Sequence, residues 1–221
     1  MWTKTVHRLN KLYGLSPRMV PCLTGEESLP TLGEVTREEL GILCNRFGFT
    51  SGVEVGVRDG EFSECLIKGN PGMALTSIDP WQAYRAGRTV VTQKEQDAIY
   101  ASAVARLSKY PTVTIVREDN LVTVTRIPDQ SLDFVYLDGD HEFGQVAREL
   151  VAWTPKVRPG GLMTGHDFRR SIRSSHHMQV VEAVMGFLTA YHIDTGFRIR
   201  PSGRHDHPSW GFVVPRGYGR D

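Results

Sequence analysis

The sequence predicts an α/β protein built on a mostly parallel β-sheet with helices on both faces. From Gly52 onward, short apolar segments alternate with longer amphipathic segments, which is the order found in parallel α/β sheets. The last two apolar segments, residues 196–202 and 209–215, are joined by a polar loop with no helix between them. Because strands joined in this way pair antiparallel, we expect one antiparallel strand at the end of the sheet.

Each of these segments predicts one element. Strands are expected over residues 52–57, 73–79, 112–116, 132–138 and 160–167. Helices are expected over residues 61–69, 93–110, 119–127, 143–157 and 177–192. A further helix begins at Thr36, because Glu39 stands three residues after this threonine, which is the spacing of a capping box.

The N-terminal region differs from the rest of the chain. Residues 1–14 predict a short amphipathic helix, and residues 15–35, with their three prolines, predict an irregular linker. We therefore divide the chain into an N-terminal extension, residues 1–35, and an α/β domain, residues 36–221. An apolar face of the first helix offers a contact surface for a homo-oligomer, although the sequence leaves the oligomeric state open; this face consists of Trp2, Leu9 and Leu12.

The composition argues against several classes of protein. A net charge of +1 over 221 residues gives no electrostatic reason to bind nucleic acid or a membrane surface. No segment approaches the ~18 apolar residues of a membrane span, and the first residues lack the apolar region of a signal peptide. The spacing of Cys22, Cys44 and Cys65 is typical of neither a zinc site nor a disulfide framework. We therefore expect a cytoplasmic protein.

A pair of glycines follows the first predicted strand of the α/β domain. In VEVGVRDG, Glu54 precedes Gly56, and Gly60 stands at the start of the next helix. Gly56 allows a tight turn, and Gly60 allows a ligand to approach the helix. A carboxylate beside them repels a pyrophosphate but suits a ligand with an ammonium or sulfonium charge. An ordinary strand-to-helix turn explains the same glycines, and the middle glycine of a dinucleotide site is missing.

Polar residues also end the next two strands, at the same predicted edge of the sheet. Asp79 can accept both hydroxyls of a ribose, as acids do in doubly wound nucleotide sites, or it can cap a turn. Trp81 can line an adenine pocket or pack in the core. Asp119 and Asn120 can hydrogen-bond an adenine amine, and a helix N-cap is an equally good explanation. We favour a nucleotide-like ligand because these residues follow the glycine pair in order.

In this order the residues resemble the S-adenosylmethionine-dependent methyltransferases of the Rossmann-like class. VEVGVRDG resembles their first glycine motif, SIDP their ribose acid and REDN their adenine-side segment. PDQSLDFVYLDGDH and ELVAWTPKVRPGGLMTGHDF resemble the small O-methyltransferase branch, akin to catechol, sugar and macrolide O-methyltransferases. The resemblance covers about residues 34–216. It implies a Rossmann-like methyltransferase sheet, S-adenosylmethionine as cofactor and a hydroxyl oxygen of a small molecule as methyl acceptor.

The stretch SLDFVYLDGDHEF ends a buried strand in three acids and a histidine. Asp138 and Asp167 end neighbouring parallel strands, so their carboxylates are expected to converge, and two carboxylates repel unless a cation or a proton lies between them. The resemblance implies that Mg²⁺ binds to this pair, with Asp138 also near the cofactor. The branch places an asparagine after the second acid, whereas a phenylalanine follows here. A third ligand is therefore missing unless Asp140, His141 or His166 supplies it, and metal dependence stays open.

Without a metal, His141 or His166 is the natural general base, because imidazole titrates near neutral pH. A hydrogen bond within its own loop is the ordinary role of a lone histidine, but the acids expected beside His141 favour a catalytic role. Three arginines after the second acid either grip an anionic substrate or form a solvated loop; they are Arg169, Arg170 and Arg173. The tract RHDH, residues 204–207, looks like a metal site but is expected to be a polar hairpin tip.

Other functions stay open. A nicotinamide-dependent oxidoreductase also uses a doubly wound sheet, but the missing glycine and the acid cluster disfavour it. A non-catalytic methyltransferase-like domain binds a cofactor or a partner without turnover. A nucleic-acid methyltransferase is disfavoured, because DGDH stands where amino-methylating members of the fold carry a proline-containing aromatic motif.

Overall fold

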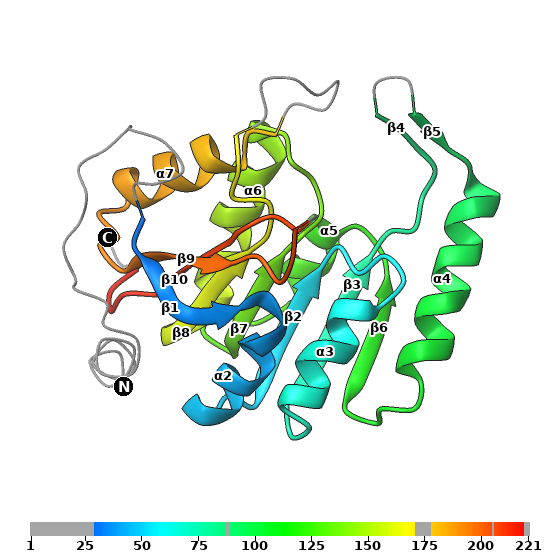
Figure 1. Ribbon diagram of the computed structural model, residues 1–221, viewed down its shortest axis with the longest axis horizontal. Helices are drawn as coiled ribbons and strands as arrows, with labels where there is room; N and C mark the ends of the chain where they lie inside the picture. Colours follow the sequence, from blue (N-terminus) through cyan, green and yellow to red (C-terminus); the bar gives the residue numbers. More distant parts are fainter. Residues whose placement is uncertain (1–28, 87–88, 171–177, 205, 219–221) are drawn as a thin grey trace.

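The computed structural model describes residues 29–86, 89–170, 178–204 and 206–218. Within this part of the chain, an eight-stranded sheet forms the centre of the molecule (Figure 1). In spatial order its strands are β1 (Thr31–Thr36), β9 (Gly196–Arg200), β10 (Ser209–Val213), β8 (Val157–Gly165), β7 (Leu132–Leu137), β2 (Ser51–Val55), β3 (Ala74–Asp79) and β6 (Val113–Arg117). The helices are α2 (Leu40–Phe47), α3 (Glu61–Gly69), α4 (Gln93–Leu107), α5 (Asn120–Thr123), α6 (Phe143–Trp153) and α7 (Val180–Ala190), with 3₁₀ turns η2 (Arg37–Glu39), η3 (Val124–Arg126) and η4 (Thr154–Lys156).

The strand directions confirm the predicted fold class. β10 runs antiparallel to both of its neighbours, β8 and β9, and the other neighbouring strands of the sheet run parallel. β9 and β10 form the hairpin expected from the absence of a helix between them. The structure is therefore a mostly parallel sheet with one antiparallel strand near its end.

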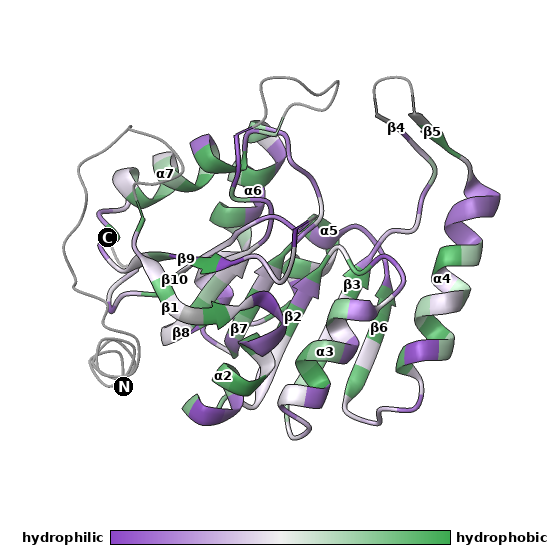
Figure 2. Ribbon diagram, in the orientation of Figure 1, coloured by the Kyte–Doolittle hydropathy of each residue, from purple (hydrophilic) through white to green (hydrophobic). Residues whose placement is uncertain are grey.

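Side chains that alternate along the strands pack against helices on both faces of the sheet. On β7, Phe134 and Tyr136 join a core cluster with α2 and α3, whereas Val135 and Leu137 join the cluster of α6 and α7. A strand that is buried on both faces reads as a continuous apolar run, which explains the sequence of β7. Figure 2 shows hydrophobic residues running through the strands and largely hydrophilic loops after them.

One strand of the sheet lies where we expected linker. Residues 31–36 form β1, which pairs parallel with β9, and Thr31 lies opposite Arg198. The prediction was wrong at this point because the prolines and glycines around the segment obscured a short strand, whose side chains Leu32 and Val35 are buried. The helix start at Thr36 is confirmed: the backbone N–H of Thr36 donates to Glu39 Oε2 over 2.9 Å.

A second unexpected element is a small ribbon between β3 and α4. β4 (Tyr84–Ala86) and β5 (Thr89–Val91) pair antiparallel and are separate from the main sheet (Figure 1). The predicted helix over residues 1–14, its apolar face and Arg173 lie outside the described residues. Cys44 is a buried core residue. None of the described helices combines the length and apolarity that a bilayer crossing needs.

Candidate active site

Three neighbouring strands end at one level of the sheet. Val55 lies opposite Leu137, and Leu137 lies opposite Gly165. Backbone hydrogen bonds continue one residue further, from the N–H of Asp138 to the Val55 oxygen (2.8 Å) and from the N–H of His166 to the Leu137 oxygen (2.9 Å). The side chains of Asp138 and His166 therefore start from rigid backbone at the carboxyl edge of the sheet, where ligands bind in α/β proteins.

The two glycines are required by the backbone at this edge. Gly56 has φ +83°, and a Cβ atom there would lie 2.1 Å from the carbonyl oxygen of Asp138. Gly60 has φ +82° and is the N-cap of α3. Because only glycine adopts such angles without steric cost, both residues shape the loop between β2 and α3. A Cβ at Gly60 would meet the Leu107 side chain at 3.0 Å, so this glycine makes room for α4, and the approach of a ligand there stays a prediction.

Glu54 is a buried acid near the end of β2. Its side chain accepts a hydrogen bond from the Ser63 hydroxyl, which is 2.8 Å from the Ser77 hydroxyl, and all three residues are buried. Burial disfavours the charged carboxylate and raises the pKa of Glu54 to about 8, although the Ser63 hydrogen bond works in the opposite direction. Glu54 is therefore largely uncharged at neutral pH in the free protein, and a cation beside it would favour its carboxylate form.

Asp79 connects the loops that follow β2 and β3. Its Oδ2 atom accepts the backbone N–H groups of Val57 and Arg58, each over 3.0 Å, and its Oδ1 atom accepts that of Trp81 over 2.7 Å. This turn-forming role is the alternative that the sequence left open. A carboxylate offers about four acceptor positions, so one remains beside the three that the loops use, and the ribose contact stays a prediction.

Trp81 packs in the core. Its indole is fully buried, donates to the carbonyl oxygen of Arg58 (2.8 Å) and lies 4.8 Å from the ring of Tyr100. A fully buried indole offers no face to an adenine ring, so the packing explanation holds for this residue.

Asp119 and Asn120 also have structural roles. Asp119 caps α5 by accepting two backbone N–H groups on its Oδ1 atom. The buried Asn120 amide donates to Glu149 over 2.9 Å and accepts from the Trp153 indole over 3.0 Å. The side chain of Asn120 is therefore directed into the interior beside α6 instead of toward a ligand, and the N-cap explanation fits Asp119.

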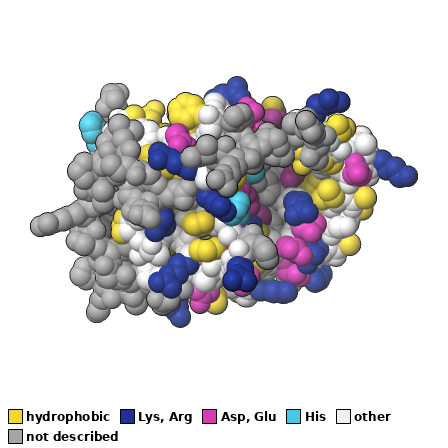
Figure 3. All heavy atoms as spheres, turned by 45° about the horizontal axis from the view of Figure 1, so that its top comes forward, with side chains coloured by type: hydrophobic (Ala, Val, Ile, Leu, Met, Phe, Trp, Pro, Cys, Tyr) yellow, Lys and Arg dark blue, Asp and Glu magenta, His cyan; other side chains and the backbone are white. Residues whose placement is uncertain are grey.

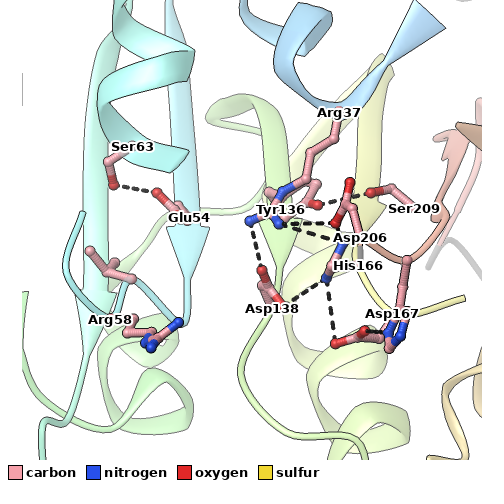
Figure 4. Close-up of polar contacts among 12 residues, drawn as sticks. Arg37, Glu54, Arg58, Ser63, Tyr136, Asp138, His166, Asp167, Asp206 and Ser209 are labelled. Carbon is pink, nitrogen blue, oxygen red and sulfur yellow. Dashed lines mark hydrogen bonds and ion pairs between the residues drawn. The ribbon is translucent and has the colours of Figure 1, made fainter. Parts of the chain in front are cut away.

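Asp138, His166 and Asp167 come together as predicted (Figure 4), and His141 joins them through Asp167. The Nδ1 atom of His166 lies 3.5 Å from Asp138 Oδ1 and 3.4 Å from Asp167 Oδ2. The Nε2 atom of His141 lies 2.7 Å from Asp167 Oδ2. An imidazole thus stands between the two carboxylates, and a second imidazole contacts one of them.

Three further residues reach this cluster, and none was predicted. Arg37 donates to Asp138 Oδ2 over 3.0 Å, Asp206 Oδ1 lies 2.9 Å from His166 Nε2, and His207 Nδ1 hydrogen-bonds Asp167. The hairpin tip was expected to be a polar loop without a role. It reaches the site because β10 is antiparallel to β8, so the loop before β10 lies at the edge where β8 ends.

Hydrogen bonds within the cluster shift the pKa values of its two histidines and of Asp167. Burial disfavours the imidazolium of His166, but hydrogen bonds to Asp138 and Asp167 outweigh burial and raise its pKa to about 10. Burial likewise opposes ionisation of Asp167, yet His141 and His166 hold the pKa of Asp167 well below its usual range. The hydrogen bond to Asp167 raises the pKa of His141. His166 is thus protonated at neutral pH, where it donates hydrogen bonds and is not available as a general base.

Backbone strain also marks this edge. Arg58, Trp81 and Asp167 have φ values of +53°, +41° and +54°, in the left-handed region that residues with side chains rarely adopt. Such angles cluster at functional sites, where the surrounding structure enforces them. Figure 3 shows histidine, acidic and basic side chains side by side near the middle of this face.

The donor set fits a divalent cation. One ligand atom each from Asp138, His141 and Asp167 lies within 4.8 Å of the others. Two carboxylates and an imidazole are ordinary ligands for divalent ions. His141 thus stands where the sequence lacked a third ligand, and the predicted pair Asp138 and Asp167 lies close enough to share an ion.

Solved structures of methyltransferases share this fold. The O-methyltransferase of Bacillus cereus, solved with SAH, has a TM-score of 0.57 and 14% identity over 95% of this chain and 90% of that chain. The O-methyltransferase TomG of Streptomyces achromogenes, solved with SAM, has a TM-score of 0.55 and 15% identity over 96% and 89%. The N-methyltransferase NodS of Bradyrhizobium japonicum has a TM-score of 0.56 and 17% identity over 81% and 95%. At these identities the similarity establishes the fold.

Sequence comparison identifies the family. No curated protein sequence matches the chain. Residues 53–168, more than half of the chain, match the family model of a methyltransferase domain. The matched segment contains Glu54 with its hydrogen-bond neighbours Ser63 and Ser77, and also the cluster around Asp138 and Asp167. The chain belongs to this methyltransferase domain family.

Proposed function

We propose that the protein transfers a methyl group from S-adenosylmethionine (SAM) to a hydroxyl oxygen of a small molecule. One observation carries the proposal: the buried acid Glu54 and the cluster of Asp138, His141 and Asp167 lie side by side at one edge of the sheet (Figure 4). The first group suits a cationic donor, and the second suits the hydroxyl of an acceptor.

The cofactor would bind over β2 and β3. The amino group and sulfonium of SAM are cationic, and a cation near Glu54 offsets the cost of burying its carboxylate. The acceptor position on Asp79 that the loops leave unused is available to a ribose hydroxyl. Structures of two similar methyltransferases contain SAM or SAH, which supports the same class of cofactor here.

Methyl transfer requires alignment and the loss of one proton. The acceptor oxygen forms a bond to the methyl carbon while the bond from carbon to sulfur breaks, leaving the thioether S-adenosylhomocysteine (SAH) and releasing the hydroxyl proton. His141 has a side chain that is 39% exposed, against 10% for His166. Of the two predicted bases, His141 is therefore the one that an acceptor can reach, and Asp167 orients its ring.

A divalent ion held by Asp138, His141 and Asp167 would lower the pKa of the acceptor hydroxyl. In that case His141 acts as a ligand, and Asp138 and Asp167 supply the negative charge that holds the ion. Mg²⁺ is the ion expected from the family resemblance. A small-molecule acceptor, a cytoplasmic location and a homo-oligomer remain predictions from the sequence.

Calorimetry and a methyl-transfer assay test the proposal. We expect SAH to bind and NAD to give no signal. Glu54→Gln should weaken SAH binding. Glu64→Gln is the control and should leave SAH binding unchanged, because Glu64 lies on the same helix as Ser63 but pairs with Lys68 and Lys109. Methyl-labelled SAM is then incubated with phenols, catechols, sugars and amines, with Mg²⁺ or with a chelator. Labelled ethers support the proposal. Binding of NAD in place of SAH, or labelling of amines alone, would contradict it.

A further inference from the structure

Arg37 lies outside the segment that defines the family, yet its side chain reaches the centre of the site. It is the first residue of η2, directly after β1. The capping box of Thr36 and Glu39 fixes this turn, and the pairing of β1 with β9 fixes the strand before it. The backbone of Arg37 is therefore anchored on both sides.

The guanidinium of Arg37 lies among three separate parts of the chain and pairs with the two acids there, Asp138 and Asp206. Its Nη2 atom donates to Asp138 Oδ2 over 3.0 Å, its Nη1 atom lies 3.4 Å from His166 Nε2, and Nη1 lies 3.8 Å from Asp206 Oδ1. Figure 4 shows these side chains converging from the turn after β1, the ends of β7 and β8, and the loop before β10.

The guanidinium of Arg37 packs against two aromatic rings, but burying one of its nitrogens costs free energy. The guanidinium carbon lies 4.2 Å from the ring centroid of Phe62 and 5.6 Å from that of Tyr136. Its Nε atom is buried and has no hydrogen-bond partner among the described residues, and such unsatisfied groups are uncommon in native proteins. The planar fork of arginine fits between the rings and Asp138, whereas the point charge of a lysine would not match it.

We propose that Arg37 is a positioning residue that fixes the orientation of the Asp138 carboxylate. The terminal torsion of an aspartate is broad and roughly two-fold, so its own backbone does not set the plane of the carboxylate. Arg37 holds Oδ2, which leaves Oδ1 directed toward His166 and the side of Asp167. Asp138 can then offer one defined oxygen to an acceptor or an ion. Only the expected effect on turnover rests on the proposed function.

The chain contains a matched control at the opposite edge of the sheet. Arg158 pairs with Asp133 near the start of β7, and its guanidinium lies 5.3 Å from the ring centroid of Phe49. The side chains of Arg37 and Arg158 are 20% and 24% exposed. Both residues are thus half-buried arginines that pair with an aspartate and stack on an aromatic ring, and only Arg37 lies at the candidate active site.

The decisive experiment compares crystal structures of the SAH complexes of wild type, Arg37→Gln, Arg37→Lys and Arg158→Gln. We expect the Asp138 carboxylate to rotate in Arg37→Gln and, by a smaller angle, in Arg37→Lys, and to be unchanged in Arg158→Gln. If Arg37→Gln does not fold, Arg37→Lys still tests whether loss of the planar fork displaces the carboxylate. An unmoved Asp138 in both Arg37 variants overturns the proposal.

Turnover provides a second readout. With an acceptor from the assay above, Arg37→Gln should lower kcat by about tenfold or more, as loss of an orienting residue does, while the KM for SAM stays unchanged. Arg158→Gln should lower the melting temperature without changing kcat. Equal losses of kcat in Arg37→Gln and Arg158→Gln would overturn the positioning role. A wild type that methylates no acceptor counts against the proposed function, and the orientation of Asp138 still decides the role of Arg37.

Discussion

The imidazole of His141 and the carboxylate of Asp167 lie 2.7 Å apart, although they follow different strands of the sheet. The contact exists because β7 and β8 are parallel neighbours that end at the same level. It places an exposed histidine against an acid that is ionised over the physiological pH range. In the function proposed above, this pair faces the methyl acceptor.

His141→Ala should abolish most of the methyl transfer. Loss of a general base or of an ion ligand costs roughly 100-fold in kcat, and the half-exposed ring contributes little to the core. The KM for SAM and the affinity for SAH should remain close to wild type, because His141 contacts Asp167, whereas the proposed cofactor contact is Glu54. Steady-state kinetics and calorimetry measure both quantities. A variant with normal kcat would remove His141 from the mechanism.

Mn²⁺ is a suitable probe of the cation site, because its binding is observed by electron paramagnetic resonance without any acceptor. We expect one bound ion per chain and at least about tenfold weaker binding in Asp167→Asn. Asp133→Asn, which changes a buried acid at the opposite edge of the sheet, should bind Mn²⁺ like wild type. Equal binding by all three proteins, or none by wild type, would contradict a cation at this cluster.

Binding of SAM should release a proton near neutral pH. Glu54 has a pKa of about 8 in the free protein because it is buried, and a nearby cation lowers this pKa by favouring the carboxylate. The affinity should therefore rise as the pH rises from 6 to about 8 and then level off. Calorimetry in buffers of different ionisation enthalpy counts the protons. Glu54→Gln should lose this pH dependence, and an unchanged pH dependence would mean that another group releases the proton.

Gly56→Ala should disrupt the site through its backbone. The new Cβ would meet the Asp138 carbonyl oxygen at 2.1 Å in a left-handed conformation, so we expect a loss of about 2 kcal/mol or more of unfolding free energy and weak SAH binding. Gly186→Ala in α7 is the control, because a Cβ there has no atom within 4 Å. Urea unfolding and calorimetry measure the two effects. Comparable stability of both variants would show that the loop can move away.

Glu64 should stabilise the fold in a pH-dependent way. Hydrogen bonds from Lys109 and Tyr110, followed by those from Lys68 and Arg106, lower its pKa to about 2. Its contribution is therefore present above the usual carboxyl pKa of about 4.3 and is lost as the pH falls toward 2. Wild type should exceed Glu64→Gln in unfolding free energy at pH 7, and the difference should shrink between pH 4 and 2. A constant difference would indicate that packing, and not charge, carries the contribution.

The sequence predicts the sheet well because its strands are buried on both faces and separated by clear turn signals. β7 and the helix α3 appear with nearly their observed bounds, and the lack of a helix before β10 correctly indicates the antiparallel strand. The segment of β1 escapes prediction because its pairing with β9 joins residues far apart in the chain. Local sequence carries no signal for such a contact.

Contacts between residues far apart in the chain also limit the prediction of the site. Asp138, His141, His166 and Asp167 are found together because each follows the end of a parallel strand. Arg37 depends on the unpredicted β1, and Asp206 and His207 depend on which edge the hairpin tip reaches. The opposite error occurs at Asn120, whose position after a strand suggested a ligand contact but whose amide is taken by Glu149 and Trp153.

A crystal structure of the SAH complex tests the central claim most directly. We expect the cofactor to lie over the loop after β2, with its sulfur between Glu54 and the pair formed by His141 and Asp167. Its amino group should approach the Glu54 side, leaving the histidine side open for an acceptor. SAH bound at a different edge of the sheet, or with its sulfur turned away from His141, would contradict the account.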